Sequence, residues 1–86
     1  MAEAKNTRKP PVLYLVLPCY NEEEVLPVSV PLFLGELERM VRSGKIDRES
    51  RILFVDDGSR DGTWSLILGL AERDKRCLGI RQSRNR

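Results

Sequence analysis

Val16-Leu17-Pro18-Cys19-Tyr20-Asn21-Glu22 and Phe54-Val55-Asp56-Asp57-Gly58-Ser59-Arg60-Asp61-Gly62-Thr63 are the two stretches that decide the fold of this chain. Each follows a short apolar run and precedes an amphipathic segment, which is typical of a turn between a strand and a helix. Two such turns from one parallel sheet open at the same edge, where ligands bind in open α/β sheets. The pair therefore predicts half of a nucleotide-type ligand site.

Three apolar segments have the character of strands. Residues 12–17 form an unbroken apolar run, which fits a strand buried on both faces of a parallel sheet. Pro18 has no amide to donate, so we expect it at the end of that strand. Residues 51–55 are the second expected strand, and residues 77–81 are a weaker third.

Two amphipathic segments between these strands predict helices. Pro27 and Pro31 each cost about 3 kcal/mol in a helix interior, so we expect the first regular helix to begin near Pro31. Gly44 is suited to a left-handed cap at its C-terminus. Either Asp61 or Ser59 is expected to cap the second helix.

The resulting order is β-α-β-α-β, which places the chain in the α/β class. Crossovers between parallel strands are right-handed in about 98% of cases, so the three strands are expected in the order 3-2-1. That arrangement is one half of a doubly wound sheet. The first strand then lies at an open, apolar edge, which favours pairing with another chain. We therefore expect a fragment of a larger domain, or a chain that self-associates through this edge strand.

Composition narrows the functional classes. The chain has 86 residues, is 41% hydrophobic and carries a net charge of only +2, so it has no overall nucleic-acid or membrane footprint. Residues 1–11 are polar and basic and are expected to form a disordered leader. The absence of a signal peptide or membrane span, with Cys19 and Cys77 as expected buried free thiols, favours the cytoplasm. Residues 75–86 contain five basic residues and no acid, which fits either a solvated tail or a phosphate-facing segment.

Paired carboxylates follow the second expected strand. Side chains alternate along a strand, so Asp56 and Asp57 point in different directions. One carboxylate can accept hydrogen bonds from a base or ribose while the other accepts amides of its own loop, or both can simply brace the turn. Tyr20 either flanks a ligand or packs against the first helix.

Several catalytic constellations are absent from the chain. It contains no phosphate-loop consensus, no G-x-G-x-x-G and no histidine, which excludes the usual ATP and dinucleotide fingerprints and any Ser-His-Asp set. No D-x-D occurs, and two adjacent aspartates cannot hold a divalent ion in a defined geometry without further ligands. The residues alone therefore predict no metal site.

Residues 18–22 after an apolar strand, followed by residues 55–63, resemble the N-terminus of family 2 glycosyltransferases. Within that family they are most similar to polyprenyl-phosphate sugar transferases such as the dolichol-phosphate mannose synthases. Residues 81–86 resemble the stretch just before that family's glycine- and lysine-containing loop. The resemblance runs from about residue 12 to residue 86.

The resemblance implies an A-type glycosyltransferase fold, a nucleotide-sugar donor of the UDP or GDP type, and a divalent metal, Mg or Mn. It also implies a polyprenyl phosphate acceptor and work at the cytoplasmic face of a membrane. By motif position, Asp57 would hydrogen-bond the base with Asp56 beside it. The nucleotide-binding residues it implies are Pro18, Tyr20, Glu22, Asp56, Asp57 and Asn85.

The chain departs from the family pattern in lacking the D-x-D motif and the catalytic base. We therefore expect residues 12–86 to be the truncated N-terminal nucleotide-binding half of an inverting transferase, with no catalytic residue or metal site of its own and inactive alone. Two other interpretations remain open. One is a non-catalytic fragment or partner-binding α/β module, and the other is a receiver-like phosphoacceptor domain.

Overall fold

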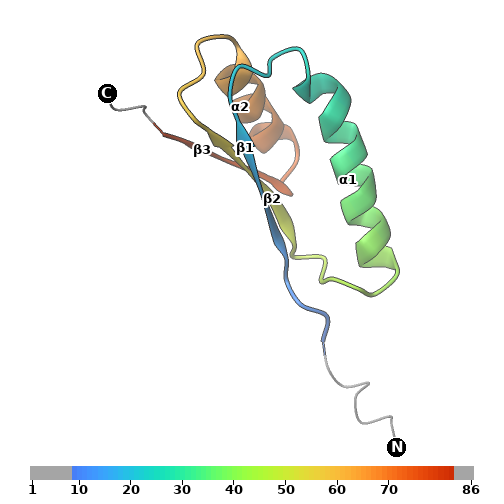
Figure 1. The fold of residues 1–86 in the computed structure, drawn as a ribbon. Helices are drawn as coiled ribbons and strands as arrows, with labels where there is room; N and C mark the ends of the chain where they lie inside the picture. Colours follow the sequence, from blue (N-terminus) through green and yellow to red (C-terminus); the bar gives the residue numbers. More distant parts are fainter. Residues whose placement is uncertain (1–8, 83–86) are drawn as a thin grey trace, which may run out of the picture.

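A computed structural model describes residues 9–82 as a parallel sheet with helices between its strands (Figure 1). The elements are β1 (Tyr14–Cys19), α1 (Leu26–Arg42), β2 (Arg51–Asp56), α2 (Thr63–Arg73) and β3 (Cys77–Arg81). In the part of the chain described, the sheet has the strand order β1-β2-β3, and both strand pairs are parallel. The predicted α/β class, element order and strand order are confirmed.

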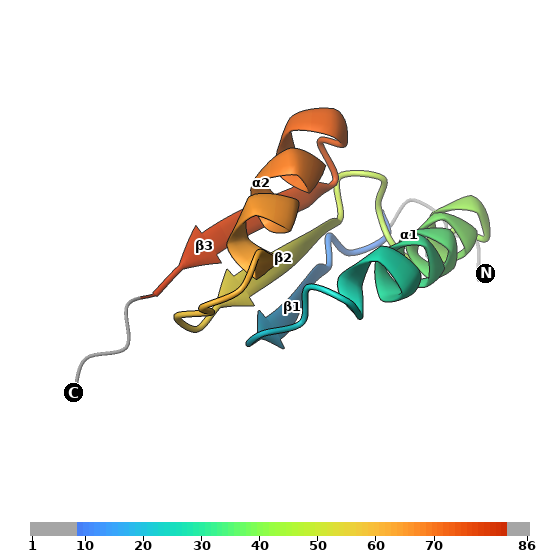
Figure 2. The ribbon, with the colours of Figure 1, turned by 90° about the horizontal axis from the view of Figure 1, so that it is seen from above.

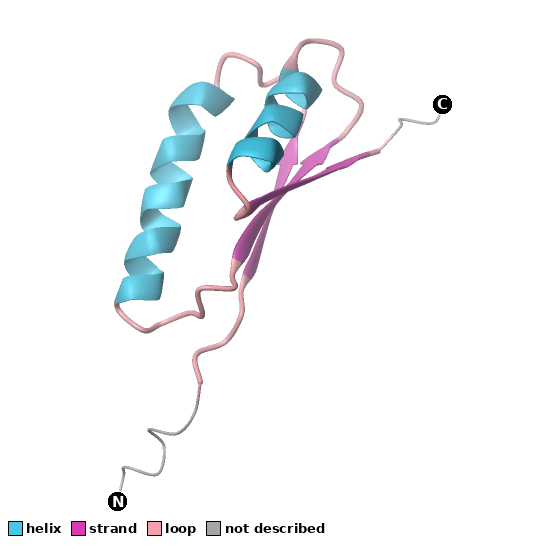
Figure 3. Ribbon diagram, turned by 180° about the vertical axis from the view of Figure 1, so that it is seen from behind, coloured by secondary structure: helices cyan, strands magenta, loops and turns pink. Residues whose placement is uncertain are grey.

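Both helices pack against the same face of the sheet. Phe54 of β2 lies level with Leu17 of β1 and Gly79 of β3, and these positions define the covered face. In Figure 3, α2 lies in front of the strands and α1 runs alongside them. The buried core contains hydrophobic side chains from β1, both helices, the α1–β2 connector, β2 and β3: Cys19, Leu26, Val30, Leu37, Ile46, Ile52, Phe54, Ile67 and Cys77.

The opposite face of the sheet is apolar and uncovered by any described element. Tyr14 and Val16 of β1 are 53% and 54% exposed, and Leu78 and Ile80 of β3 are also exposed. Both crossovers run in the same direction with the same hand, so both helices fall on one side (Figure 2). The prediction that the first strand is buried on both faces is therefore wrong for the described residues. We call this surface the bare face.

Pro18 lies inside β1, level with Val55, and not at the end of the strand as expected. The carbonyl groups of Leu13 and Cys19 accept hydrogen bonds from the N–H groups of Arg51 and Asp57, respectively, at 2.9 Å each. Odd-numbered residues of β1 therefore face β2, and residue 18 turns its backbone toward the open edge. A proline is tolerated there because no ladder bond needs its missing amide. The strand consequently runs over residues 14–19 rather than 12–17.

Helix α1 begins at Leu26, five residues before the expected start at Pro31. Pro27 falls in the first turn, where the absent amide has no partner to lose. Pro31 does lie inside the helix, at a cost of about 3 kcal/mol. Burial of Val30 and Leu37 on either side of it, at about 1.5–3 kcal/mol each, outweighs that cost.

The sequence predicted a cap at the C-terminus of α1 and another at the N-terminus of α2. Gly44 has φ 80° and donates its N–H to Val41 O at 3.0 Å, while Lys45 donates to Met40 O at 3.0 Å. This is the expected glycine cap, in the form of a Schellman motif. The N-cap position of α2 is held by Gly62 and not by Asp61 or Ser59, but the Asp61 carboxylate accepts the N–H of Thr63, the first residue of the helix, at 2.9 Å.

Candidate functional site

Two loops meet at the carboxyl edge of the sheet, residues 20–25 after β1 and residues 57–62 after β2 (Figure 1). Cys19 is paired with Asp56 in the register, so Tyr20 and Asp57 each follow the last paired residue of neighbouring parallel strands. The Asp57 N–H donates to the Cys19 carbonyl at 2.9 Å, which joins the two chains at that point. Tyr20 is 42% exposed and Asp57 is half-buried, so both lie within reach of solvent.

Side chains bind these two loops together beyond the end of the sheet. The Asn21 N–H donates to Ser59 Oγ at 2.8 Å, and the Glu22 N–H donates to Thr63 Oγ1 at 2.7 Å. The Arg60 N–H in turn donates to Asn21 Oδ1 at 2.8 Å. Two further bonds join Glu23 to the 57–62 loop: its N–H donates to Asp61 Oδ2 at 3.2 Å, and its Oε1 accepts from the Gly62 N–H at 3.0 Å. We call this set of contacts the loop clasp.

Asp56 is fully buried, and its carboxylate serves its own loop. It accepts a hydrogen bond from the Ser59 N–H at 3.3 Å and another from the Ser59 hydroxyl. Arg81 Nε lies 3.4 Å from the same carboxylate, and the Arg81 guanidinium also stands 5.8 Å from the centre of the Trp64 ring. Of the two aspartates, Asp56 therefore braces the turn, while Asp57 follows at the point where the loop leaves the sheet. Gly58 next to it has φ 77°, a conformation that favours glycine.

The remaining nucleotide-binding candidates are Pro18, Glu22 and Asn85. Pro18 is exposed on the bare face and at the open edge of β1. The Glu22 carbonyl accepts from the amides of Val25 and Leu26 at 3.0 and 2.9 Å, so this residue starts the turn that leads into α1. Asn85 lies outside the described residues. The structure thus brings Tyr20, Glu22, Asp56 and Asp57 to one edge, and their contact with a ligand stays a prediction.

Sequence reasoning missed the contribution of Asn21 to this edge. Its φ of 51° is left-handed, a conformation that asparagine tolerates better than most residues. Its amide and its side-chain oxygen are bonded to residues 59 and 60 of the other loop. An asparagine directly after a strand and its aromatic neighbour was the available signal, because Asn is enriched in turns that need positive φ.

Neither cysteine has the character of a nucleophile. Cys19 and Cys77 are buried and free, as expected from the sequence. Burial, followed by the nearby Glu22 and Asp56 carboxylates, raises the pKa of the Cys19 thiol to about 11. Burial is also the main cause that raises the pKa of Cys77. Both thiols are therefore protonated at neutral pH, and the thiolate is the reactive form.

The described residues do not fit a divalent metal. Between residues 9 and 82, no group of three or more Asp, Glu, Cys or His side chains is placed to hold an ion. The Asp56 carboxylate is already engaged by Ser59 and Arg81.

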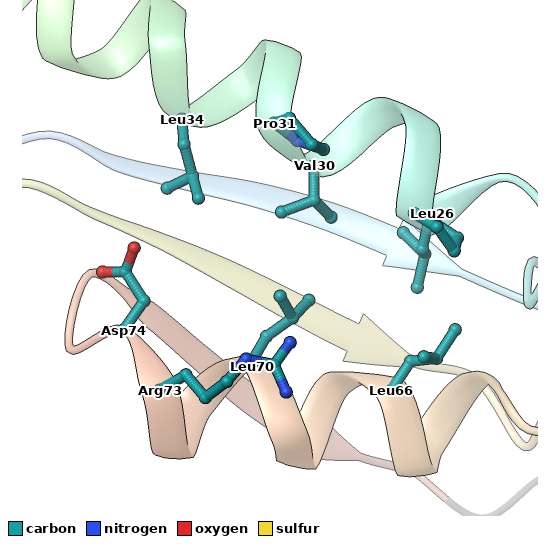
Figure 4. Close-up of a pocket in the computed structure, with 9 residues that line it drawn as sticks. Leu26, Val30, Pro31, Leu34, Leu66, Leu70, Arg73 and Asp74 are labelled. Carbon is teal, nitrogen blue, oxygen red and sulfur yellow. The ribbon is translucent and has the colours of Figure 1, made fainter.

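An apolar groove runs between α1 and α2. Its volume is about 470 Å³, and its walls come from both helices (Figure 4). Leu26, Val30 and Leu34 of α1 point toward Leu66 and Leu70 of α2 across this groove.

Neither helix in residues 9–82 has the combination of length and apolarity that crossing a bilayer requires.

The chain belongs to glycosyl transferase family 2, whose model matches residues 14–86. It is 40% identical over 75 residues to the "uncharacterized glycosyltransferase YkoT" of Bacillus subtilis strain 168, covering 87% of this chain and 22% of that protein. It is 43% identical over 60 residues to an undecaprenyl-phosphate 4-deoxy-4-formamido-L-arabinose transferase of Pseudomonas paraeruginosa PA7, covering 70% and 16%. It is 35% identical over 71 residues to a prophage bactoprenol glucosyl transferase homolog of Escherichia coli K12, covering 83% and 21%.

The family resemblance drawn from the two motifs is confirmed by these matches. The chain spans about a fifth of the length of the curated relatives it matches. No solved structure matches it significantly.

Proposed function

We propose that this chain binds the nucleoside part of a nucleotide-sugar donor, of the UDP or GDP type, as the N-terminal portion of an inverting glycosyltransferase. The observation that carries the proposal is the meeting of the Tyr20 and Asp57 loops at one carboxyl edge of a parallel sheet. Ligands in open α/β sheets occupy this edge. In this proposal Asp57 accepts hydrogen bonds from the base, the Tyr20 ring flanks it, and Pro18 and Glu22 lie beside them.

In this proposal Asp56 holds the loop and does not contact the ligand, because its carboxylate is buried. Asn85 remains a proposed contact beyond the described residues. The acceptor we propose is a polyprenyl phosphate, since two of the relatives carry undecaprenyl-phosphate or bactoprenol in their names. Buried free thiols suit a reducing compartment, which supports the cytoplasmic face of a membrane as the place of work.

Nucleotide titration followed by residue-resolved NMR tests the donor-site proposal. We expect UDP or GDP to shift the amide signals of Tyr20, Asp57 and Gly58 and to leave α1 and β3 unchanged. Asp57→Ala removes a charged acceptor, whose hydrogen bonds contribute about 1.5–3 kcal/mol, and should weaken binding by at least about tenfold. Glu72→Ala, an exposed acid on α2, is the matched control and should leave the affinity unchanged. Shifts spread over the whole surface, or equal effects of both substitutions, would contradict the proposal.

A second candidate role is association through the bare face and the open edge of β1. The observation that favours it is the continuity of Tyr14 and Val16 with Leu78 and Ile80, all exposed on one face next to an edge with no described partner strand. Parallel sheets are normally covered on both faces. We propose a second copy of this chain as the occupant.

Light scattering over a range of concentrations tests this association. The wild-type chain is expected to form dimers as its concentration rises, and Val16→Lys should keep it monomeric by placing a charge in the interface. Val28→Lys, at an exposed position of α1, is the control and should dimerise like the wild type. A wild-type chain that stays monomeric throughout, or a control that dissociates equally, would rule out the bare face as the contact.

A further inference from the structure

We propose that the hydroxyl groups of Ser59 and Thr63 are positioning groups, which hold the Tyr20 loop against the Asp57 loop without contacting the ligand. The inference rests on the proposed nucleotide binding at this edge and names the residues on which its geometry depends. Two features carry it: the buried position of both hydroxyls, and their use as donor and acceptor at once.

Ser59 connects the buried aspartate to the opposite loop. Its Oγ donates to the Asp56 carboxylate and accepts the Asn21 N–H at 2.8 Å. Asp56 directly precedes Asp57, and Asn21 directly follows Tyr20. The Ser59 hydroxyl therefore joins Asp56, the neighbour of Asp57, to Asn21, the neighbour of Tyr20.

Thr63, four residues further along the chain, repeats this arrangement. Its Oγ1 donates to the Asp61 carboxylate and accepts the Glu22 N–H at 2.7 Å. Asp61 also accepts the Glu23 N–H, so the acid and the hydroxyl together satisfy two consecutive amides of the Tyr20 loop. Tyr20 consequently lies between the sheet bond at Cys19 and a run of three anchored amides.

The chemistry of a hydroxyl explains why Ser and Thr occupy these positions. A carboxylate only accepts hydrogen bonds, whereas a hydroxyl donates one and accepts others. Each aspartate accepts a hydrogen bond from the hydroxyl, whose oxygen still has a lone pair to accept from an amide of the opposite loop. Loss of either hydroxyl would leave one of these amides without its acceptor and favour solvent entry between the loops.

The clasp also constrains the backbone conformation of Asn21. Its left-handed φ of 51° is uncommon for a residue other than glycine. Such conformations persist where surrounding contacts over-determine them. Both bonds of Asn21 across the clasp, to Ser59 Oγ and from the Arg60 N–H, supply that constraint.

Amide hydrogen exchange separates a positioning role from a general contribution to stability. Ser59→Ala and Thr63→Val remove the hydroxyls, while Ser59→Thr and Thr63→Ser retain them. In Ser59→Ala and Thr63→Val we expect the exchange of Asn21 and Glu22, respectively, to rise at least about tenfold. The exchange of the Ile52 amide, which donates to the Arg76 carbonyl inside the sheet, should rise clearly less than that of the loop amides. An equal rise at Ile52 would reduce the role to overall stability and overturn the proposal, as would unchanged exchange in the loops.

Titration with UDP and GDP provides the functional arm of the same experiment. We expect Ser59→Ala and Thr63→Val to weaken nucleotide binding by about tenfold, and the hydroxyl-retaining variants to restore it. Unchanged affinity in the two hydroxyl-lacking variants would overturn the link between the clasp and the site. If the wild type binds neither nucleotide while the loop amides respond as expected, the donor-site proposal falls and the positioning of the loops stands.

Discussion

Phe54→Ala is expected to lower the free energy of unfolding of this chain by about 3–5 kcal/mol, the largest loss of any single substitution considered. Phe54 is fully buried in the central strand, level with Leu17 and Gly79 and beneath the helices. Replacing a buried Phe with Ala typically costs about 3–5 kcal/mol, because a cavity is left behind. The total stability of a chain of this size is about 4–13 kcal/mol, so the loss takes much of it. Urea unfolding followed by the fluorescence of Trp64, the single tryptophan, measures the change.

Two controls give this prediction a sharp outcome. Phe54→Leu keeps most of the volume and should cost less than about 1.5 kcal/mol. Val16→Ala lies on the bare face, 54% exposed, and should change the free energy of unfolding by about 0.5 kcal/mol or less. If Phe54→Ala proved no more damaging than Val16→Ala, the assignment of covered and bare faces would be wrong.

The order and direction of the strands could be predicted from the sequence because they depend on local patterns. Short apolar runs alternating with amphipathic segments define parallel β-α-β units, and the handedness of crossovers then leaves one strand order. The boundaries depended on tertiary context instead. Pro18 fits inside β1 because residue 18 faces the open edge, and α1 continues through Pro31 because its neighbours Val30 and Leu37 are buried. Neither condition can be read from the residues themselves.

The location of the candidate site was predictable, whereas its internal connections were not. The strand ends place Tyr20 and Asp57 together once the strands are known to be parallel neighbours. Alternation along β2 predicted that one aspartate would turn inward, but only the packing shows that it is Asp56. The clasp joins residues 38 to 41 positions apart, such as Asn21 with Ser59 and Glu22 with Thr63. Contacts over that distance depend on the left-handed turn at Asn21, for which the sequence has only a weak signal.

The apolar run at residues 12–17 shows how a fold half can be recognised while its burial is misjudged. Unbroken apolarity normally indicates a strand covered on both sides. In the described residues only the side of Leu15 and Leu17 packs against the core, and Tyr14 and Val16 are exposed. Unbroken apolarity therefore does not distinguish a strand covered on both faces from β1, which is covered on one face in the described residues.

Asp56→Ala is expected to destabilise the chain by about 3 kcal/mol in the absence of any ligand. The substitution leaves the buried Ser59 amide and hydroxyl without their acceptor, and each stranded donor costs about 1–3 kcal/mol. It also removes the carboxylate that lies 3.4 Å from Arg81 Nε, although the half-exposed guanidinium is readily hydrated. Urea unfolding measured with and without nucleotide gives the change in the free energy of unfolding.

Two variants distinguish a bracing role of Asp56 from a role in ligand contact. Asp56→Asn keeps one oxygen to accept from Ser59, so it should lose less stability than Asp56→Ala. Asp57→Ala, at the next and less buried position, should cost clearly less stability but more nucleotide affinity. If Asp56 contacted the ligand instead, Asp56→Asn would lose little stability but much nucleotide affinity. The buried carboxylate and its bonds to Ser59 favour the bracing role. A carboxylate that is enclosed by its own loop stabilises the folded chain whether or not a ligand is bound.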